Sequence, residues 1–324
     1  MDRQCPYCGK TGFELLFAAP DFDTGKKTFH ICRCGQCGLA RTEPQLSDDE
    51  LGRYYALPYY GTGEAKFTGP AEKITRFFNH RRAKTITCRL HDGTKPASGI
   101  SGRVLDIGCG RGSLLATLRD MGYECDGVER HEFPSGGLPR GIKFHTGKLE
   151  DIAFDKDFFD AIIIWHVLEH VDDPVAMIKE ASRILRPGGL LAIAVPNFGS
   201  IQSGFFKQNW FHLDLPRHIY HFTPGTLTGI LEKFGFIISH TTTFSAEQNI
   251  FGFVQSALNM IARRRTPNRF YSLIKKTVER PSPAVLMSWA ALACLILPFA
   301  VIEYLVSGMA GKGASLIMFS KRNM

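Results

Sequence analysis

The chain has 324 residues, of which 44% are hydrophobic and 22% charged, and its formal net charge is +8. This composition excludes a disordered chain, and the length allows one substantial core with a smaller module. The positive charge favours anionic partners, namely nucleic acid, phosphate-bearing substrates or an acidic lipid surface. The N-terminus is polar and contains cysteines, which is not the pattern of a cleavable signal peptide.

Five of the nine cysteines precede residue 40, and the odd total indicates metal ligation in a reducing compartment. Two C-x-x-C-G units, Cys5–Gly9 and Cys34–Gly38, can each hold one side of a tetrahedral Zn²⁺ ion. We therefore predict a zinc ribbon over residues 1–45, with short strands between the two units. Four thiolates leave no open position, so the site is structural; iron in a rubredoxin-like site is the alternative. The predicted metal ligands are Cys5, Cys8, Cys34 and Cys37.

Residues 46–100 are predicted to be a linker with N-terminal helices. The linker contains two tyrosine pairs, which are expected to stack over an adenine or to line a substrate cleft; the alternative is a short helix that packs its aromatic residues on the domain. These tyrosines are Tyr54, Tyr55, Tyr59 and Tyr60. Residues 70–92 have a helical pattern, and their basic residues, Arg82 among them, are expected on a solvated face.

From Arg103 onward, apolar runs alternate with amphipathic segments. The expected helices are 113–121, 174–185 and 226–234, the second one opened by Asp173 as N-cap and closed by Pro187–Gly189. This alternation predicts an α/β fold with a doubly wound, mostly parallel sheet. The expected strands are 104–107, 124–128, 142–145, 161–165, 190–195, 237–243 and 315–320.

The first of these strands runs directly into the glycine-rich loop Asp106–Gly112, and a helix follows it. Glycine allows a tight turn and lets backbone N–H groups approach a ligand closely. Glu129, about 20 residues further on, stands where a nucleotide-binding unit places the acid that accepts ribose hydroxyls. The spacing is not G-x-G-x-x-G, and an acid beside the loop suits a cationic ligand better than a pyrophosphate.

At these residues the chain resembles the class I S-adenosylmethionine-dependent methyltransferases. The resemblance implies a seven-stranded, Rossmann-like sheet whose last strand is inserted antiparallel beside the sixth. It also implies that the loop residues Asp106, Gly108, Cys109, Gly110 and Gly112 hold the methionine part of the cofactor, and that Glu129 binds its ribose.

The cofactor's adenine is expected after the third strand, where the family usually has an acid. Lys148 occupies that position here, which leaves Leu149 and Glu150 as substitutes. The segment Trp165–Val171 resembles the family's motif after strand four, so His166 is predicted to contact cofactor or substrate; a packed, hydrogen-bonded histidine is the alternative.

The loop after the fifth strand, residues 197–222, is rich in histidine and aromatic residues. It resembles a W-x-x-L-D-x-P-R-H lid of bacterial methyltransferases found among glycan-assembly enzymes. Methyl transfer to a hydroxyl requires a base for its proton, and we assign this role to His218, with Asp214 or Arg217 orienting it or the substrate. The alternative is a lid held together by buried histidine hydrogen bonds.

Toward the C-terminus, basic residues between Arg263 and Arg280 precede the apolar run 284–306, whose only charge is Glu303. We expect a bent hairpin, broken at Pro298, that lies in the interface of a membrane through residues 263–306. A soluble helical core or dimer contact, and a true membrane span, are the alternatives. The expected location is the cytoplasm, on the cytoplasmic face of the inner membrane.

The sequence thus predicts an S-adenosylmethionine-dependent methyltransferase that transfers a methyl group to a saccharide hydroxyl, on a lipid-linked or nucleotide-linked saccharide. The alternatives are a zinc-ribbon RNA methyltransferase, although nucleic acid is not favoured, and a non-catalytic scaffold on a membrane. The expected organisation is the ribbon, the linker, a cofactor-binding core over 101–248 that includes the lid, a helical insertion over 249–312, and the last core strand over 313–324.

Overall fold

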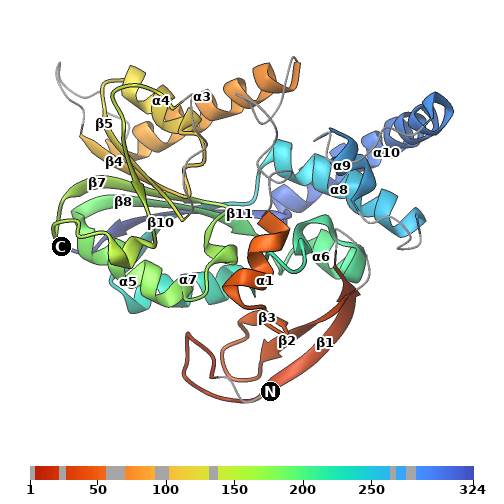
Figure 1. Ribbon diagram of the computed structural model, residues 1–324, viewed down its shortest axis with the longest axis horizontal. Coiled ribbons are helices and arrows are strands. Elements are labelled where there is room, and N and C mark those ends of the chain that lie inside the picture. Colours follow the sequence, from red (N-terminus) through yellow and green to blue (C-terminus); the bar gives the residue numbers. More distant parts are fainter. Residues whose placement is uncertain are drawn as a thin grey trace. The chain divides into compact units, whose positions relative to one another are not determined.

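Figure 1 shows the computed structural model of the chain. It describes residues 4–21, 27–55, 70–91, 102–130, 138–262, 268–274 and 282–324. The chain divides into two compact units. Unit 1 comprises Met1–Phe67, Pro196–Thr226 and Thr242–Leu316, and unit 2 comprises Thr68–Val195, Leu227–Thr241 and Ile317–Met324.

Unit 1 contains an antiparallel four-stranded sheet in the order β1-β2-β3-β9. Its strands are β1 (Phe13–Pro20), β2 (Thr28–Cys34), β3 (Ala40–Glu43) and β9 (Tyr220–His221). The first three come from the predicted ribbon. The fourth, β9, comes from the predicted lid. It pairs with β3, with Ala40 opposite His221 and Arg41 opposite Tyr220. The lid therefore supplies the edge strand of the ribbon sheet.

The helices of unit 1 pack on this sheet and on each other. Phe29 and Ile31 of β2 are buried in one cluster with Trp210 and Leu213 of the lid and with Ala257 of a helix later in the chain. The α-helices are α1 (Asp48–Gly52), α6 (Ile201–Phe206), α8 (Ala246–Ile261), α9 (Arg269–Ile274) and α10 (Pro283–Met309). Short 3₁₀ turns are η1 (Arg53–Tyr55), η4 (Lys207–Asn209) and η5 (Phe211–Leu213).

The predicted break at Pro298 is wrong, because α10 is one continuous helix that includes this proline. A proline removes one backbone hydrogen bond and crowds the preceding turn. On either side of Pro298, however, Ile296 and Ala300 pack in the cluster formed by Val254 and Leu258 of α8. Contact with α8 therefore holds both turns in line.

Unit 2 contains the seven-stranded sheet, in the order β10-β11-β8-β7-β4-β5-β6. Its strands are β4 (Arg103–Ile107), β5 (Glu124–Glu129), β6 (Lys143–Thr146), β7 (Phe159–Trp165), β8 (Leu185–Pro196), β10 (Phe236–Thr242) and β11 (Ser315–Arg322). The pairs β4–β5, β4–β7, β5–β6 and β7–β8 are parallel.

The last strand, β11, lies between β8 and β10. Asn323 N–H donates to the Gly235 carbonyl, whereas Ser239 Oγ donates to the Phe319 carbonyl. The residue numbers in these pairs change in opposite directions, so β11 runs antiparallel to β10. The predicted doubly wound α/β sheet with an inserted final strand is confirmed.

Helices cover both faces of this sheet: α3 and α4 lie on one side and α5 and α7 on the other (Figure 1). Their bounds are α3 (Pro70–Leu90), α4 (Ser113–Asp120), α5 (Pro174–Ile184) and α7 (Pro224–Lys233), with 3₁₀ turns η2 (Leu149–Asp151) and η3 (Leu168–His170). Asp173 caps α5 as predicted, since its side chain accepts hydrogen bonds from two backbone N–H groups. Pro187–Gly189, expected to end α5, instead lies inside β8, which begins directly at Leu185.

Candidate active site and metal centre

The glycine loop connects β4 to α4. Gly108 has φ +71°, and a Cβ added there would lie 2.2 Å from Cγ2 of Val167. Gly112, with φ +70°, would bring a Cβ within 2.7 Å of the Phe144 ring. Any other residue at either position would be strained in its backbone and would collide with a neighbour. The loop therefore requires glycine for its shape.

Glu129 ends β5 and is tied to this loop. Its Oε2 accepts a hydrogen bond from the Gly110 N–H at 3.0 Å, and its Oε1 accepts one from the Arg130 N–H at 3.2 Å. The Gly108 N–H in turn donates to the Val128 carbonyl at 2.8 Å. Loop and carboxylate are thus held in a fixed arrangement at the carboxyl ends of two adjacent parallel strands, where ligands bind in such sheets.

A cavity of about 270 Å³ opens at this edge of unit 2. Four of the predicted cofactor residues line it: Gly108, Glu129, Leu149 and Glu150. Among the described residues, its lining does not include five other predicted ones, namely Asp106, Cys109, Gly110, Gly112 and His166. The pattern did not point to Val167, Asp172 or Met177, which also line the cavity.

Asp106, the first residue of the glycine loop, still belongs to β4, and its side chain is buried. Burial raises the pKa of this carboxyl to about 7, an increase that Arg82 opposes and Glu129 reinforces. The Arg82 guanidinium lies 4.1 Å from the centre of the Trp165 ring, a cation–π contact, and donates to Asn79 Oδ1.

The expectation that Arg82 faces solvent is therefore wrong. Its aliphatic stem and planar head pack on an aromatic ring, and its charge acts on a buried carboxyl. Arg82 is a candidate site residue that the sequence analysis missed. Its position in α3, ahead of the glycine loop in the chain, gave no signal.

Lys148, which stands where the resemblance led us to expect an adenine-binding acid, belongs to a group of three charged side chains. Its Nζ lies 3.3 Å from Asp172 Oδ2, and the Arg130 guanidinium lies 2.9 Å from the same oxygen. All three residues border the cavity. One carboxylate thus offsets two cations at the cavity edge.

His166 directly follows β7 and has φ +54°, which is uncommon for a residue with a side chain. Its Nδ1 lies 3.2 Å from Oε1 of the buried Glu169, and its N–H donates to the Ala194 carbonyl. These contacts hold both the backbone and the imidazole ring of His166 in place. Whether His166 meets cofactor or substrate stays a prediction.

The other predicted catalytic residues, His218 and Asp214, belong to unit 1. His218 is buried, and its Nδ1 lies 2.8 Å from the carbonyl oxygen of His212. A carbonyl only accepts, so Nδ1 carries the proton and the neutral ring has its lone pair on Nε2. Asp214 Oδ2 lies 3.9 Å from Nε2, and both Asp214 oxygens accept hydrogen bonds from Arg217.

Thr42 of β3 fastens this segment to the ribbon sheet. Its hydroxyl donates to the His218 carbonyl at 2.6 Å, and its N–H donates to the Ile219 carbonyl at 2.9 Å. The hydroxyl has one proton, so it must accept the hydrogen bond at 3.0 Å from His221 Nε2. A single buried threonine thus holds His218, Ile219 and His221 of the lid in place.

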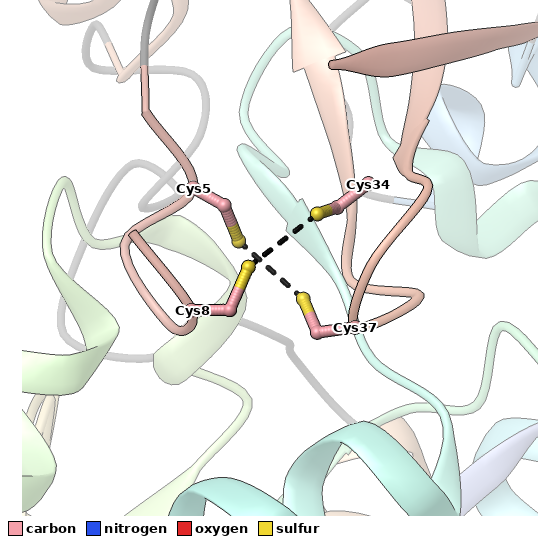
Figure 2. A group of neighbouring side chains, drawn as sticks. All are labelled: Cys5, Cys8, Cys34 and Cys37. Carbon is pink, nitrogen blue, oxygen red and sulfur yellow. Dashed lines mark hydrogen bonds between the residues drawn. The ribbon is translucent and has the colours of Figure 1, made fainter. Parts of the chain in front are cut away.

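The four predicted cysteine ligands converge in unit 1 (Figure 2). Cys5 Sγ lies 3.5 Å from Cys37 Sγ, and Cys8 Sγ lies 3.6 Å from Cys34 Sγ. All four sulfurs lie within 4.8 Å of one another. Thiolates about 2.3 Å from a tetrahedral Zn²⁺ ion are roughly 3.8 Å apart, so the four donors fit such an ion.

Backbone N–H groups lower the pKa of Cys34, whereas burial outweighs such hydrogen bonds at Cys5 and Cys37 and raises their pKa values. Burial raises the pKa of Cys34, but the N–H groups of Cys37 and Gln36 lower it, and the balance brings the pKa to about 7. Gly9 and Gly38, with φ +71° and +78°, close the two turns. Cys32, which the sequence analysis left out, lies within β2 and is not part of the cluster.

Of the linker tyrosines, Tyr54 and Tyr55 lie in η1, directly after the short helix α1. The Tyr54 carbonyl accepts a hydrogen bond from Arg217. Tyr59 and Tyr60 lie outside the described residues.

Comparison with known proteins agrees with this architecture. A family model described as a methyltransferase domain matches residues 67–241. A ubiquinone biosynthesis O-methyltransferase of Methylobacterium sp. (strain 4-46) is 26% identical over 228 residues, covering 63% of this chain and 87% of the relative. A probable S-adenosylmethionine-dependent methyltransferase of Mycolicibacterium smegmatis is 28% identical over 204 residues, covering 60% of this chain and 72% of the relative.

Among solved structures, a putative sarcosine dimethylglycine methyltransferase from Galdieria sulphuraria matches with a TM-score of 0.48 and 18% identity, over 85% of this chain and 99% of that one. The family match covers more than half of the chain and includes the whole glycine loop. The protein therefore belongs to the methyltransferase-domain family and is an S-adenosylmethionine-dependent methyltransferase.

Proposed function

We propose that the protein transfers a methyl group from S-adenosylmethionine to a hydroxyl oxygen of its acceptor. The observation that carries this proposal is the cradle in unit 2, where Gly108 leaves room that a Cβ would fill and Glu129 is fixed beside it. In this proposal the glycine loop holds the methionine part of the cofactor and Glu129 accepts its ribose hydroxyls. When bound, the cofactor supplies an electrophilic methyl group on a sulfonium.

His218 is our candidate for the base that takes the hydroxyl proton. Its Nδ1–H donation to His212 selects the tautomer with a basic Nε2, and Asp214 at 3.9 Å would stabilise the imidazolium formed by proton uptake. Arg217, through its two hydrogen bonds to Asp214, fixes that carboxylate. Asp214 is thus a positioning residue in this proposal.

A His218→Gln variant separates this role from a structural one. A base predicts a large fall in kcat at unchanged KM for the cofactor, together with loss of the acidic limb of the pH–rate profile. A purely structural histidine predicts a lower melting temperature with an unchanged pH profile.

Two acceptor classes are supported. The resemblance of the lid to glycan-assembly methyltransferases favours a saccharide hydroxyl on a lipid-linked or nucleotide-linked carrier. The relatives named as ubiquinone biosynthesis O-methyltransferases favour a hydroxyl of a quinone precursor instead. Both classes are hydroxyls, so the same base chemistry serves either.

The acceptor class is tested with the full-length protein and methyl-labelled S-adenosylmethionine. Nucleotide sugars, lipid-linked saccharides and phenolic quinone precursors are offered separately, and mass spectrometry locates the label. We expect a labelled methyl group on an oxygen atom in one acceptor class, and no labelled product with a Glu129→Ala variant. Binding of the cofactor without label in any hydroxyl would overturn the O-methyl proposal.

We further propose that the four-cysteine cluster binds a structural Zn²⁺ ion. Its support is the sulfur spacing described above and the absence of an open position among four thiolates. Metal analysis of the purified protein should give one equivalent of zinc, and a Cys8→Ser variant should give less. Iron as the predominant metal would contradict the assignment.

A further inference from the structure

Helix α10 exposes far more apolar surface than a soluble protein normally does. It has 27 residues, about 40 Å in length, with a mean hydropathy of 2.4 in its most apolar window, of which 6% is buried. Apolar patches this long mark an interaction surface. The helix projects alongside α8 and α9 in Figure 1.

One narrow stripe of α10 packs against unit 1. Trp289, Leu292, Ile296 and Ala300 follow one another at helical spacing and join the cluster of Val254 and Leu258 on α8. This contact leaves most of the circumference of α10 uncovered.

The opposite stripe is apolar and highly exposed. Met287, Leu295, Ile302 and Met309 are separated by eight, seven and seven residues, so they lie along one face of the helix. Their side chains are 72%, 69%, 59% and 74% exposed. Between them stand Ala291, Pro298 and Leu305 at the intermediate turns of the same face, which has no polar side chain.

The only charge of α10 points away from that face. Glu303 is half-buried and accepts a hydrogen bond from Gln202 Nε2 of α6 at 2.7 Å. The outward face is thus free of charge along its whole length.

Basic residues accumulate directly before α10 in the sequence. Between Ile261 and Pro283 there are seven lysines and arginines and one acidic residue. Such segments are attracted to anionic lipid headgroups. A second copy of this chain has the same net charge of +8, which opposes its approach to these basic residues, whereas an anionic bilayer complements both the apolar face and the basic residues.

We propose that α10 lies in the interface of an anionic lipid bilayer, with its outward stripe in the acyl region. The helix does not cross the membrane in this proposal, because both of its ends return to the same helical bundle. At one end, β11 begins at Ser315, whose N–H donates to Asn249 Oδ1 of α8 at 3.0 Å. At the other, only residues 275–282 separate it from α9, which is fixed to α8 by the Tyr271 N–H donation to Gln255.

Vesicle flotation tests the proposal with the full-length protein. We expect it to float with vesicles containing phosphatidylglycerol, to float less with phosphatidylcholine vesicles, and to be released partly by salt. A Leu295→Glu/Ile302→Glu variant should lower the bound fraction at least tenfold. The matched control, Leu15→Glu/Ile237→Glu, introduces the same charges at sites 55% and 58% exposed and should float like the unmodified protein.

Three results would overturn the proposal. The first is a protein that does not float with either kind of vesicle, for example because it forms a dimer that the Leu295→Glu/Ile302→Glu change dissociates. The second is flotation that this change leaves intact. The third is resistance to extraction by alkaline carbonate, which would indicate a spanning helix. If the double variant fails to bind S-adenosylmethionine, Met287→Glu probes the same face at the helix terminus. None of these outcomes bears on the methyl acceptor.

Discussion

Replacing Thr42 with valine tests whether the ribbon sheet positions the histidine segment. Valine keeps the shape of threonine, so the buried site stays filled and the β3–β9 pairing of the backbone is retained. The change removes only the hydroxyl, and with it the hydrogen bonds to the His218 carbonyl and to His221 Nε2. A Thr42→Ser variant, which keeps the hydroxyl, is the matched control.

The size of the effect follows from the burial of these groups. Each lost hydrogen bond between neutral groups costs roughly 0.5–1.5 kcal/mol, and a buried polar group without compensation costs about 1–3 kcal/mol. We therefore expect the free energy of unfolding to fall by about 1–3 kcal/mol. If His218 shifts by about 1 Å, a loss of roughly 10²-fold in kcat is the expected scale.

The assay combines three measurements on Thr42→Val, Thr42→Ser and the unmodified protein. Chemical denaturation gives stability, calorimetry gives the dissociation constant for S-adenosylmethionine, and initial rates give kcat. Because the cavity is lined by residues of unit 2 alone, cofactor affinity should be unchanged while kcat falls. An unchanged kcat despite lower stability would refute the idea that Thr42 places a catalytic histidine.

The remaining predictions concern the cofactor loop, its buried acid and the metal. Gly108→Ala should weaken cofactor binding much more than Gly110→Ala does, because both have positive φ but only Gly108 would clash, as calorimetry can measure. The pKa of Asp106 is about 7 in the folded protein and 3.8 in the unfolded chain, so the folded state binds the proton more tightly. The free energy of unfolding therefore falls as the pH rises from about 4 to 7. Asp106→Asn should therefore gain stability relative to the unmodified protein over this range, by roughly 1.4 kcal/mol per pH unit at most, and the difference should be constant above it; denaturation at several pH values checks this. Chelation of the metal, or Cys8→Ser, should abolish kcat while calorimetry still detects cofactor binding by unit 2.

The sequence predicted the sheet of unit 2 closely because each strand carries its own signal. Buried parallel strands are continuous apolar runs, and β7 and β8 stand out for that reason. The glycine run after Asp106, together with an acid about 20 residues further along the chain, indicated the loop and Glu129. Errors are confined to element ends, such as the start of β8, where Pro187–Gly189 has the composition of a turn but continues the strand.

What could not be predicted depends on contacts between distant parts of the chain. Nothing in the two-residue strand Tyr220–His221 indicates that it pairs with β3, about 180 residues earlier. Arg82 looked like a solvent-facing residue because its helix is basic, and only the position of Trp165 shows otherwise. The continuity of α10 through Pro298 likewise depends on packing against α8.

These long-range contacts assign the ribbon sheet a task in addition to the metal binding proposed above. Its second cysteine pair, Cys34 and Cys37, lies at the end of β2 and in the turn into β3, so a metal ion bound there would hold the β2–β3 register from which Thr42 projects. Thr42 in turn holds His218 and His221 of a segment that has little regular structure of its own. Fixing the backbone of such a loop in one conformation costs about 1–2 kcal/mol of conformational entropy per residue, so the loop needs contacts that hold it. A structural metal stabilises a small sheet strongly. The ribbon is therefore best understood as the rigid support that lets a histidine-rich loop keep one conformation next to its own sheet.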